Sequence, residues 1–226
     1  MKQIALDIGL HAGPTLANFC AGPNGAALQH VQLWLGDTPQ HRSPVPTYLW
    51  GVSGSGKSHL LKAAREGLRE QGARVGWLDA SVHQAPAYAE DWAAVILDDV
   101  HLYTAAQQQQ AFNWFVHAQT LQRPVLAAGE HAPVDLRLRE DLRTRLGWGH
   151  VFGLQLLSEA ERRAVLRQAA DARGVFLGDE VMDFMLTRFS RDLGHLMELL
   201  DLLDGYSLQS KRAITIPMIK SMMENQ

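Results

Sequence analysis

The feature that most constrains the fold is a glycine-rich segment with the spacing G-x-x-x-x-G-K-S, running from Gly51 to Ser58. It follows the apolar residues Tyr48-Leu49-Trp50 and precedes Leu60-Leu61. A strand, a glycine turn and a helix in this order form a P-loop, whose backbone N–H groups cradle phosphates at a helix N-terminus. We then expect Lys57 to reach the β- and γ-phosphates and Ser58 to ligate Mg²⁺. The alternative is a purely structural turn between a strand and a helix.

Composition limits the class of protein. The 226 residues are 46% hydrophobic, which suits one medium domain or a domain with a small satellite. The net charge of −3 argues against a large nucleic-acid footprint. A single cysteine, Cys20, cannot form an internal disulfide, so a cytoplasmic location is expected. We find no signal peptide, no apolar run long enough for a membrane span, and no histidine grouping that predicts a metal site beyond nucleotide-bound Mg²⁺.

The first two thirds of the chain alternate between apolar runs and helical patterns, which predicts an α/β fold with a parallel sheet. Strands are expected at 48–50, 75–79, 95–99, 124–129 and 151–156. Helices are expected at 26–35 with Asn24 as N-cap, at 56–71 with Gly72 as terminator, and after the run Gln107–Gln110. We interpret that glutamine run as the solvated start of its helix.

After Leu157 the pattern is helical only. Ser158-Glu159-Ala160-Glu161 has the form of a capping box, and Gly174 ends the helix that it opens. Asp179 and Asp192 are expected to cap the next two helices, and Pro217 to lie in the first turn of the last one. Leucines and methionines in these helices are expected to form a core. The predicted domains are a peptide at 1–12, an α/β base at 13–157 and a helical lid at 158–226.

Two carboxylates and an arginine are candidates for phosphate chemistry. Asp98, at the end of an apolar run, is expected to help hold Mg²⁺. Asp99 is expected either to orient an attacking water or to be an ordinary strand-end carboxylate. Arg145 has the chemistry needed to stabilise charge on the γ-phosphate of a neighbouring molecule. The residues alone do not separate it from Arg137, Arg139 and Arg143, or from a solvated surface charge.

The N-terminal residues Gln3-Ile4-Ala5-Leu6-Asp7-Ile8 alternate between apolar and polar side chains. This pattern fits a core strand, and it equally fits a short peptide that docks in a partner's groove. The residues themselves leave both interpretations open.

Taken together, the P-loop, the Asp98-Asp99 pair, Arg145 and the helical tail resemble the AAA+ ATPases, and more narrowly the DnaA/Hda family. The narrower resemblance covers essentially the whole chain and rests on Gly51–Leu61, 97–100, Gly147-Trp148-Gly149 and, less specifically, 213–217. It implies a three-layer α/β base with a five-stranded parallel sheet, followed by a small all-helical lid. It also implies that ADP or ATP binds with Mg²⁺ on Ser58 and Asp98. The residues then expected at the nucleotide are Phe19, Cys20, Ala21, Gly51, Ser53, Gly54, Ser55, Gly56, Lys57, Ser58, His59 and Asp98.

The same resemblance implies a regulatory function. Residues 3–8 are similar to the sliding-clamp-binding peptide of the shorter family members, with Gln3, Ile4, Leu6 and Ile8 as the contact residues. Arg145 matches the family's arginine finger, and Asp99 its water-orienting acid. The function implied is negative regulation of replication initiation, in which the DNA-loaded clamp holds the chain while Arg145 stimulates hydrolysis of the ATP on DnaA. The partners implied are ATP-bound DnaA, the DNA polymerase III sliding clamp and a second copy of this chain.

Three features bear on the competing functions. Gly194 stands near the position of the family's lid arginine, and Ala127-Ala128-Gly129-Glu130 is poor in hydrogen-bond donors. Both departures predict slow ATP hydrolysis by this chain alone. The sequence ends at Gln226, directly after the lid, so no sequence-specific DNA binding is expected. The alternative function is a self-sufficient AAA+ ATPase, such as a helicase loader or a clamp-loader subunit.

Overall fold

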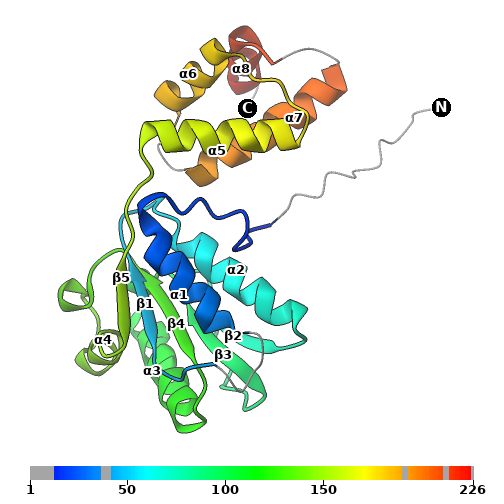
Figure 1. Cartoon of the computed structure of the whole chain (residues 1–226). Helices are drawn as coiled ribbons and strands as arrows, with labels where there is room; N and C mark the ends of the chain where they lie inside the picture. The colour runs from blue at the N-terminus through cyan, green and yellow to red at the C-terminus, as the bar shows by residue number, and fades with distance from the viewer. Residues whose placement is uncertain (1–12, 37–41, 190–192, 211–213, 225–226) are drawn as a thin grey trace. The chain divides into compact units, whose positions relative to one another are not determined.

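A computed structural model describes residues 13–36, 42–189, 193–210 and 214–224, with the side chains of 208–210 and 223–224 left out. The chain divides into two compact units (Figure 1): the first comprises Met1–Gly51 and Gly56–Leu154, and the second comprises Gln155–Gln226 together with Val52–Ser55 of the glycine-rich segment. Within the described residues, no helix combines the length and the apolar character needed to cross a membrane. The predicted docking peptide, Gln3–Ile8, lies outside the described residues.

The first unit is built on a five-stranded parallel sheet with the strand order β2-β3-β4-β1-β5. The strands are β1 (Thr47–Trp50), β2 (Arg74–Leu78), β3 (Trp92–Leu97), β4 (Val125–Gly129) and β5 (His150–Gly153). The predicted five-stranded parallel sheet is therefore confirmed. The observed ends differ by one to three residues, and the last strand stops at Gly153 rather than at 156.

Alternate residues of the central strands belong to two different cores, because successive strand side chains point to opposite faces. Tyr48, Leu97 and Val125 pack with residues of the helices on one face, whereas Leu49 and Leu126 pack with helices on the other. Helices α1 (Gly25–Leu35) and α2 (Lys57–Glu70) cover one face, and α3 (Ala105–Thr120) and α4 (Glu140–Leu146) cover the other (Figure 1). This is the predicted three-layer base.

Local signals for the helices are partly confirmed. Gly72 follows α2 with a φ of 75°, the left-handed conformation that suits a glycine after a helix. Asn24 occupies the N-cap position of α1, but its side chain does not accept the capping hydrogen bond, because the preceding residues already form the short 3₁₀ helix η1 (Gly22–Asn24). Helix α4 was not predicted, since its seven residues form a short and mainly polar segment.

The interpretation of the glutamine run as solvated is wrong for Gln107, which is only 5% exposed. Thr104 and Gln107 form a reciprocal capping box at the start of α3. The amide nitrogen of Gln107 also donates hydrogen bonds to the carbonyl oxygens of Asp79, Ala80 and Val82, at 3.0–3.3 Å. Gln107 therefore ties the segment after β2 to α3, a contact between residues too far apart in sequence for a local pattern to reveal.

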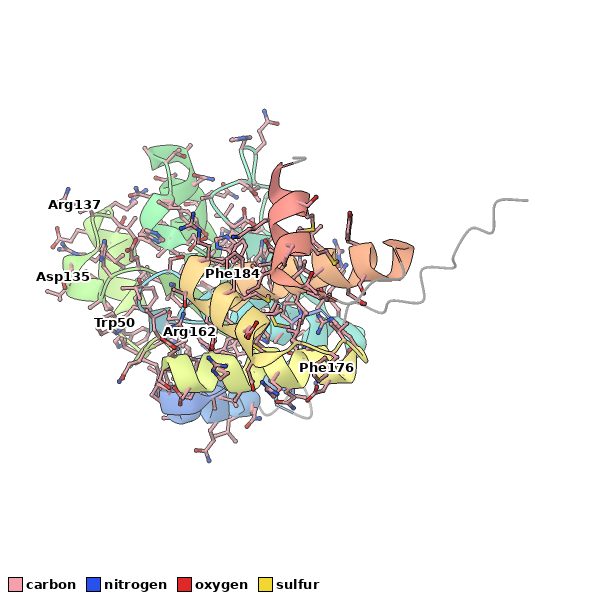
Figure 2. All side chains as sticks on the ribbon, turned by 90° about the horizontal axis from the view of Figure 1, so that it is seen from above. Trp50, Asp135, Arg137, Arg162, Phe176 and Phe184 are labelled. Carbon is pink, nitrogen blue, oxygen red and sulfur yellow. The ribbon has the colours of Figure 1, made fainter. Side chains whose placement is uncertain are left out.

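The second unit contains four helices with a core of their own. They are α5 (Glu159–Ala172), α6 (Asp179–Arg188), α7 (Leu193–Ser210) and α8 (Ile216–Glu224). The capping box of Ser158 and Glu161 is confirmed, and Pro217 lies in the first turn of α8. Buried leucines and methionines fill the core as predicted. Figure 2 marks Phe176, in the segment that joins α5 to α6.

The predicted cap of α6 is wrong. Gly178, not Asp179, is the N-cap, and no side chain caps the helix. Asp179 instead lies 2.5 Å from a guanidinium nitrogen of Arg167 on α5, so its carboxylate is used in an ion pair between helices. The predicted cap of α7, Asp192, lies outside the described residues.

Candidate functional site

The segment after β1 has the backbone geometry of a phosphate-binding loop. Gly51, Gly54 and Gly56 all have positive φ angles, at 152°, 80° and 96°, which residues with a Cβ adopt only with strain. Helix α2 begins directly at Lys57, so its unpaired backbone N–H groups are at the end of the loop. Lys57 is 6% exposed, and its ammonium donates a 2.7 Å hydrogen bond to the carbonyl of Gly51. This hydrogen bond holds the cation of Lys57 against the backbone at the start of the loop.

Buried polar groups in this loop fit an anionic ligand. The hydroxyl of Ser55 is buried and has no hydrogen-bond partner among the described residues. An unpaired buried hydroxyl costs free energy, and a phosphate oxygen would supply the missing partner. No group of three or more His, Cys, Asp or Glu side chains within the described ranges is arranged to hold a metal ion.

Asp98 and Ser58 lie together, as expected of two Mg²⁺ ligands. Asp98 directly follows β3 and is 3% exposed. The side chain of Ser58 is hydrogen-bonded to its carboxylate. Burial, and to a smaller extent the negative charge of Asp99, raise the pKa of Asp98 to about 6, and the Ser58 hydrogen bond opposes this shift. A bound cation would favour the ionised carboxylate, as expected of a Mg²⁺ ligand.

Asp99 has an unusual backbone conformation. Its φ and ψ are 50° and 42°, in the left-handed region, which Asp tolerates better than most residues. Its backbone N–H donates a 3.0 Å hydrogen bond to the carboxylate of Asp98. The turn thus places two successive carboxylates at the carboxyl end of β3, which β4 separates from β1, the strand that the P-loop follows. Whether Asp99 orients a water stays a prediction.

Phe19, Cys20 and Ala21 form the second segment expected at the nucleotide, and the ring of Phe19 lies against the start of α2. A Cβ built on Gly56 would be 2.7 Å from Cε2 of Phe19, so this glycine is needed both for its φ angle and for the close approach of the ring. The ring of Phe19 is 5.5 Å from that of His59, centroid to centroid. Nε2 of His59 lies 3.0 Å from the carbonyl oxygen of Thr15, and burial lowers the pKa of His59. The neutral ring therefore donates its Nε2–H to Thr15. Cys20 and Ala21, which follow Phe19, are partly buried.

One polar contact at this edge was missed from the sequence. Nδ1 of His101 accepts a 3.3 Å hydrogen bond from the backbone N–H of Glu130, and Nε2 of the same ring lies 3.4 Å from the Glu130 carboxylate. The proton therefore resides on Nε2. Burial lowers the pKa of His101, which keeps the ring neutral. The region after β4 was predicted to be poor in donors; the donor comes from η3 (Val100–Leu102), a segment distant in sequence.

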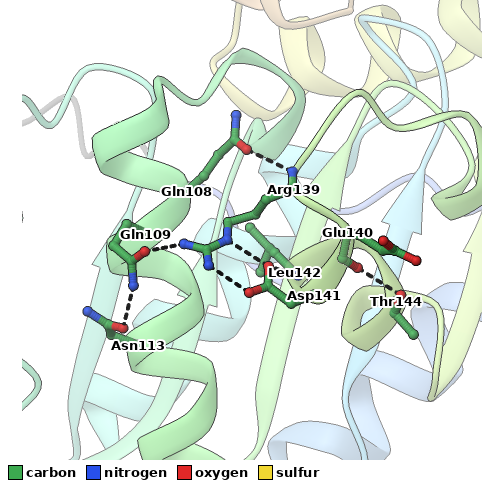
Figure 3. Close-up of polar contacts among 8 residues, drawn as sticks. All are labelled: Gln108, Gln109, Asn113, Arg139, Glu140, Asp141, Leu142 and Thr144. Carbon is green, nitrogen blue, oxygen red and sulfur yellow. Dashed lines mark hydrogen bonds and ion pairs between the residues drawn. The ribbon is translucent and has the colours of Figure 1, made fainter.

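Arg139, one of the four arginines near α4, is bound within the protein (Figure 3). Its Nε and Nη2 donate to the two carboxylate oxygens of Asp141, at 2.6 and 2.7 Å, and its Nη1 donates to Gln109. Its backbone N–H donates a 2.9 Å hydrogen bond to Gln108. A guanidinium held in a bidentate pair with a carboxylate is not available to a phosphate. Arg139 is therefore a structural residue.

Arg145 is held differently. Its Cζ lies 5.4 Å from the ring centroid of Phe112 on α3, and Cζ of Arg139 lies 4.9 Å from the same ring. Within the described residues, no carboxylate lies at ion-pair distance from Arg145 or from Arg143. Both side chains are partly exposed. The aromatic ring orients Arg145 while leaving its charge uncompensated.

The two parts of the candidate site lie at opposite ends of two neighbouring strands of the sheet. Strands β1 and β5 are parallel and in register, with Thr47 beside His150 and Trp50 beside Gly153. The P-loop follows the carboxyl end of β1, whereas α4 connects to the amino end of β5. The strand between these ends spans roughly 10 Å. The structure brings together the P-loop, Phe19, His59 and Asp98, and it does not bring Arg145 to them.

Comparisons with known proteins agree with the fold described above. Residues 159–223 match the family model described as "Hda, lid domain". The structure is similar to domain III of the replication initiation protein DnaA from Thermotoga maritima, with a TM-score of 0.76 and 19% identity over 93% of this chain and 95% of that one. It is also similar to AMPPCP-bound DnaA from Aquifex aeolicus, with a TM-score of 0.67 and 22% identity over 84% of this chain and 64% of that one. A more distant similarity is to the Thermotoga maritima RuvB Holliday junction branch migration motor, with a TM-score of 0.62 and 16% identity over 88% and 68% of the two chains. These similarities show the AAA+ fold.

Proposed function

We propose that this DnaA/Hda-like AAA+ protein is a negative regulator of replication initiation that stimulates the hydrolysis of ATP bound to DnaA. In this function the chain binds ADP or ATP with Mg²⁺ at its own P-loop. It is held at the DNA-loaded sliding clamp by residues 3–8, with Gln3, Ile4, Leu6 and Ile8 as contacts. Arg145 then acts as the arginine finger toward the nucleotide of the partner.

The observation that carries this proposal is the position of Arg145. It precedes the amino end of β5, whereas the P-loop follows the carboxyl end of the neighbouring strand β1. A side chain there cannot complete the chain's own phosphate site, so its uncompensated charge is available to a second molecule. In-line phosphoryl transfer builds negative charge on the γ-phosphate oxygens, and an arginine supplied by a neighbour is worth about 10³–10⁵ in rate. The required phosphate is a triphosphate on another P-loop protein, for which DnaA is the family candidate.

The decisive experiment measures hydrolysis of ATP on DnaA in the presence of the DNA-loaded clamp. Wild-type chain should accelerate hydrolysis, and Arg145→Ala should reduce the stimulated rate by about 10³-fold, to background. Arg143→Ala is the matched control, because Arg143 lies two residues away on α4, lacks an ion pair in the described structure and should leave stimulation unchanged. Full stimulation by the Arg145→Ala protein would refute the finger assignment.

Clamp recruitment is tested by Gln3→Ala in the same assay. We expect this protein to fold normally, to lose clamp binding in a pull-down with the purified clamp, and to stimulate hydrolysis only when its concentration is raised. Unchanged clamp binding by the Gln3→Ala protein would show that residues 3–8 are not the docking peptide.

A second candidate, a self-sufficient AAA+ ATPase, is favoured by one observation. Lys57 is in place in the P-loop, and Ser58 is hydrogen-bonded to Asp98, so the chain's own phosphate site is complete in these residues. Steady-state hydrolysis of Mg²⁺–ATP by the isolated chain, at several turnovers per second and without DnaA, would support this second function. We expect much slower turnover, because Arg145 lies at the opposite end of the sheet from the P-loop and Gly194 provides no lid cation.

A further inference from the structure

Two large apolar side chains are exposed at the end of the sheet that carries Arg145. Trp148 is 69% exposed and Val134 is 78% exposed. Trp148 follows Gly147, the C-cap of α4, and its backbone N–H donates a 3.3 Å hydrogen bond to the carbonyl of Arg145. Val134 lies in η4 (Pro133–Asp135), which contacts α4. Exposed tryptophan is expensive in water and is enriched among the energetically dominant residues of interfaces.

The turn that carries Trp148 is tightly held. A Cβ on Gly147 would lie 3.1 Å from Cβ of Pro133, and a Cβ on Gly149 would collide with the carbonyl oxygen of Pro46. That carbonyl also accepts a 2.9 Å hydrogen bond from the backbone N–H of His150. Both neighbours of Trp148 are therefore fixed against other segments while its own side chain is exposed. A rigid aromatic anchor loses little conformational entropy when it binds.

Two arginines lie on the same segments as these apolar residues. Arg145 lies on the last turn of α4 without an ion pair in the described structure, and Arg137 is exposed in the segment between η4 and α4. Figure 2 labels Asp135 and Arg137, which extend outward from this segment. The carboxylates of Asp135 and Glu140 are exposed there as well. This end of the sheet thus combines an apolar anchor with the uncompensated charge of Arg145, which suits an anionic group of a partner, such as a nucleoside triphosphate on an occupied P-loop.

We infer that Trp148 and Val134 form the docking anchor by which this chain engages the nucleotide-bearing face of a second P-loop ATPase. The anchor supplies binding, whereas Arg145 supplies transition-state stabilisation once the partner's triphosphate is beside it. This inference rests on the proposed function, because it takes the occupant of this end of the sheet to be the molecule whose triphosphate Arg145 contacts. It goes further by assigning affinity and rate to different residues.

The assignment predicts a separation of concentration dependence from maximal rate. In a titration of this chain against ATP-loaded DnaA with the DNA-loaded clamp, Trp148→Ala should raise the half-saturating concentration at least tenfold, while the rate at saturation stays at the wild-type value. Val134→Ser should raise the half-saturating concentration by a smaller factor. Arg145→Ala should have the opposite effect: the stimulated rate at saturation is lost, while the half-saturating concentration stays at the wild-type value.

Two further variants keep the test specific. Phe176→Ala is the matched control, because Phe176 is 84% exposed and lies in the second unit, so its removal should change neither quantity. Trp148→Phe should recover part of the affinity, because a smaller aromatic ring still fills the contact. Circular dichroism and the melting temperature of each variant establish that it is folded, as expected for a substitution at an exposed position.

Direct binding of each variant to immobilised ATP-loaded DnaA distinguishes the possible failures. If Trp148→Ala binds and stimulates like wild type while Arg145→Ala abolishes stimulation, the docking anchor is wrong and the proposed function stands. If wild type binds without stimulating, the proposed function is wrong, and a tenfold loss of binding by Trp148→Ala still upholds the anchor. If wild type does not bind ATP-loaded DnaA at all, both are overturned.

Discussion

Asp98 is the residue at which burial and charge conflict most directly. Its carboxylate is nearly inaccessible to water, lies beside Asp99, and is satisfied by the hydroxyl of Ser58 and the backbone N–H of Asp99. These hydrogen bonds do not offset the loss of hydration, so the pKa of Asp98 rises from 3.8 to about 6. An acid with a raised pKa destabilises the folded state when ionised, and the site relieves that cost when it binds a cation.

This conflict predicts the pH dependence of stability without nucleotide and in the presence of EDTA. Below pH 3.8 the Asp98 carboxyl is mainly protonated in both the folded and the unfolded state and does not destabilise the fold. The destabilisation by the ionised carboxylate grows between pH 4 and 6 and is complete above about pH 6. Asp98→Asn should therefore be more stable than wild type at pH 8, by about 3 kcal/mol, and the difference should vanish near pH 4. Thermal unfolding across this pH range provides the measurement.

The matched control for Asp98 is Asp135→Asn, which removes an exposed carboxylate. It should shift stability by no more than about 0.5 kcal/mol at any pH. A wild-type protein as stable as Asp98→Asn at pH 8 would show that Asp98 is not raised in pKa. The same Asp98→Asn protein should bind nucleotide less tightly in Mg²⁺, since it lacks an ionic ligand.

At the scale of elements, α3 shows how one side chain joins segments that are distant in sequence. Gln107 closes the capping box with Thr104 and satisfies carbonyls of the chain after β2. The phenol of Tyr103, just before the helix, also donates to the carbonyl of Leu78 at 2.7 Å. These contacts hold the end of β2 and the start of α3 together. Strand β2 pairs with β3, the strand that directly precedes Asp98.

Gln107→Ala is expected to destabilise the protein by about 1–3 kcal/mol, because it leaves three carbonyls short of a donor and removes half of a capping box. Urea unfolding of the variant and of wild type measures the change. Thr120→Ala is the matched control on the same helix, since Thr120 is exposed and its hydroxyl donates within the helix, to the carbonyl of Val116; it should change stability by no more than about 0.5 kcal/mol. Equal stabilities of the two variants would show that the buried amide is not a structural tie.

At the scale of the whole molecule, two compact units with separate cores lie on one chain. Nucleotide is expected to bind through the P-loop, where Gly51, Gly54 and Gly56 already adopt positive φ angles. Because the loop needs little rearrangement, binding should add its free energy directly to the stability of the folded protein. The stabilisation by nucleotide is therefore a property of the folded chain rather than of any single contact.

Adding Mg²⁺–ADP at a hundredfold excess over its dissociation constant should stabilise the protein by about 2.7 kcal/mol, seen as a higher melting temperature. Lys57→Ala should remove most of the shift, because Lys57 is the buried cation of the loop. Arg69→Ala, in the last turn of α2, serves as the control and should retain the shift. No shift in wild type would show that the loop does not bind ADP under these conditions.

The sequence by itself determined the parts that depend on near neighbours. The G-x-x-x-x-G-K-S spacing required glycines at left-handed positions, and the observed φ angles at Gly54 and Gly56 follow from it. Apolar runs between turns predicted the parallel strands, and the spacing of Ser158 and Glu161 predicted a capping box that the structure confirms. In these cases, the decisive interactions lie within a few residues of chain.

Only the tertiary structure decided which side chains are buried or already paired within the protein. Four arginines between positions 137 and 145 look alike in sequence, yet Arg139 is neutralised by Asp141, whereas Arg145 lies over Phe112 with no ion pair among the described residues. Gln107 looked solvated and is buried, whereas Trp148, between two closely packed glycines, is exposed. Burial and pairing depend on segments far apart in the chain, because the free energy of a side chain is set by what packs against it rather than by its sequence neighbours.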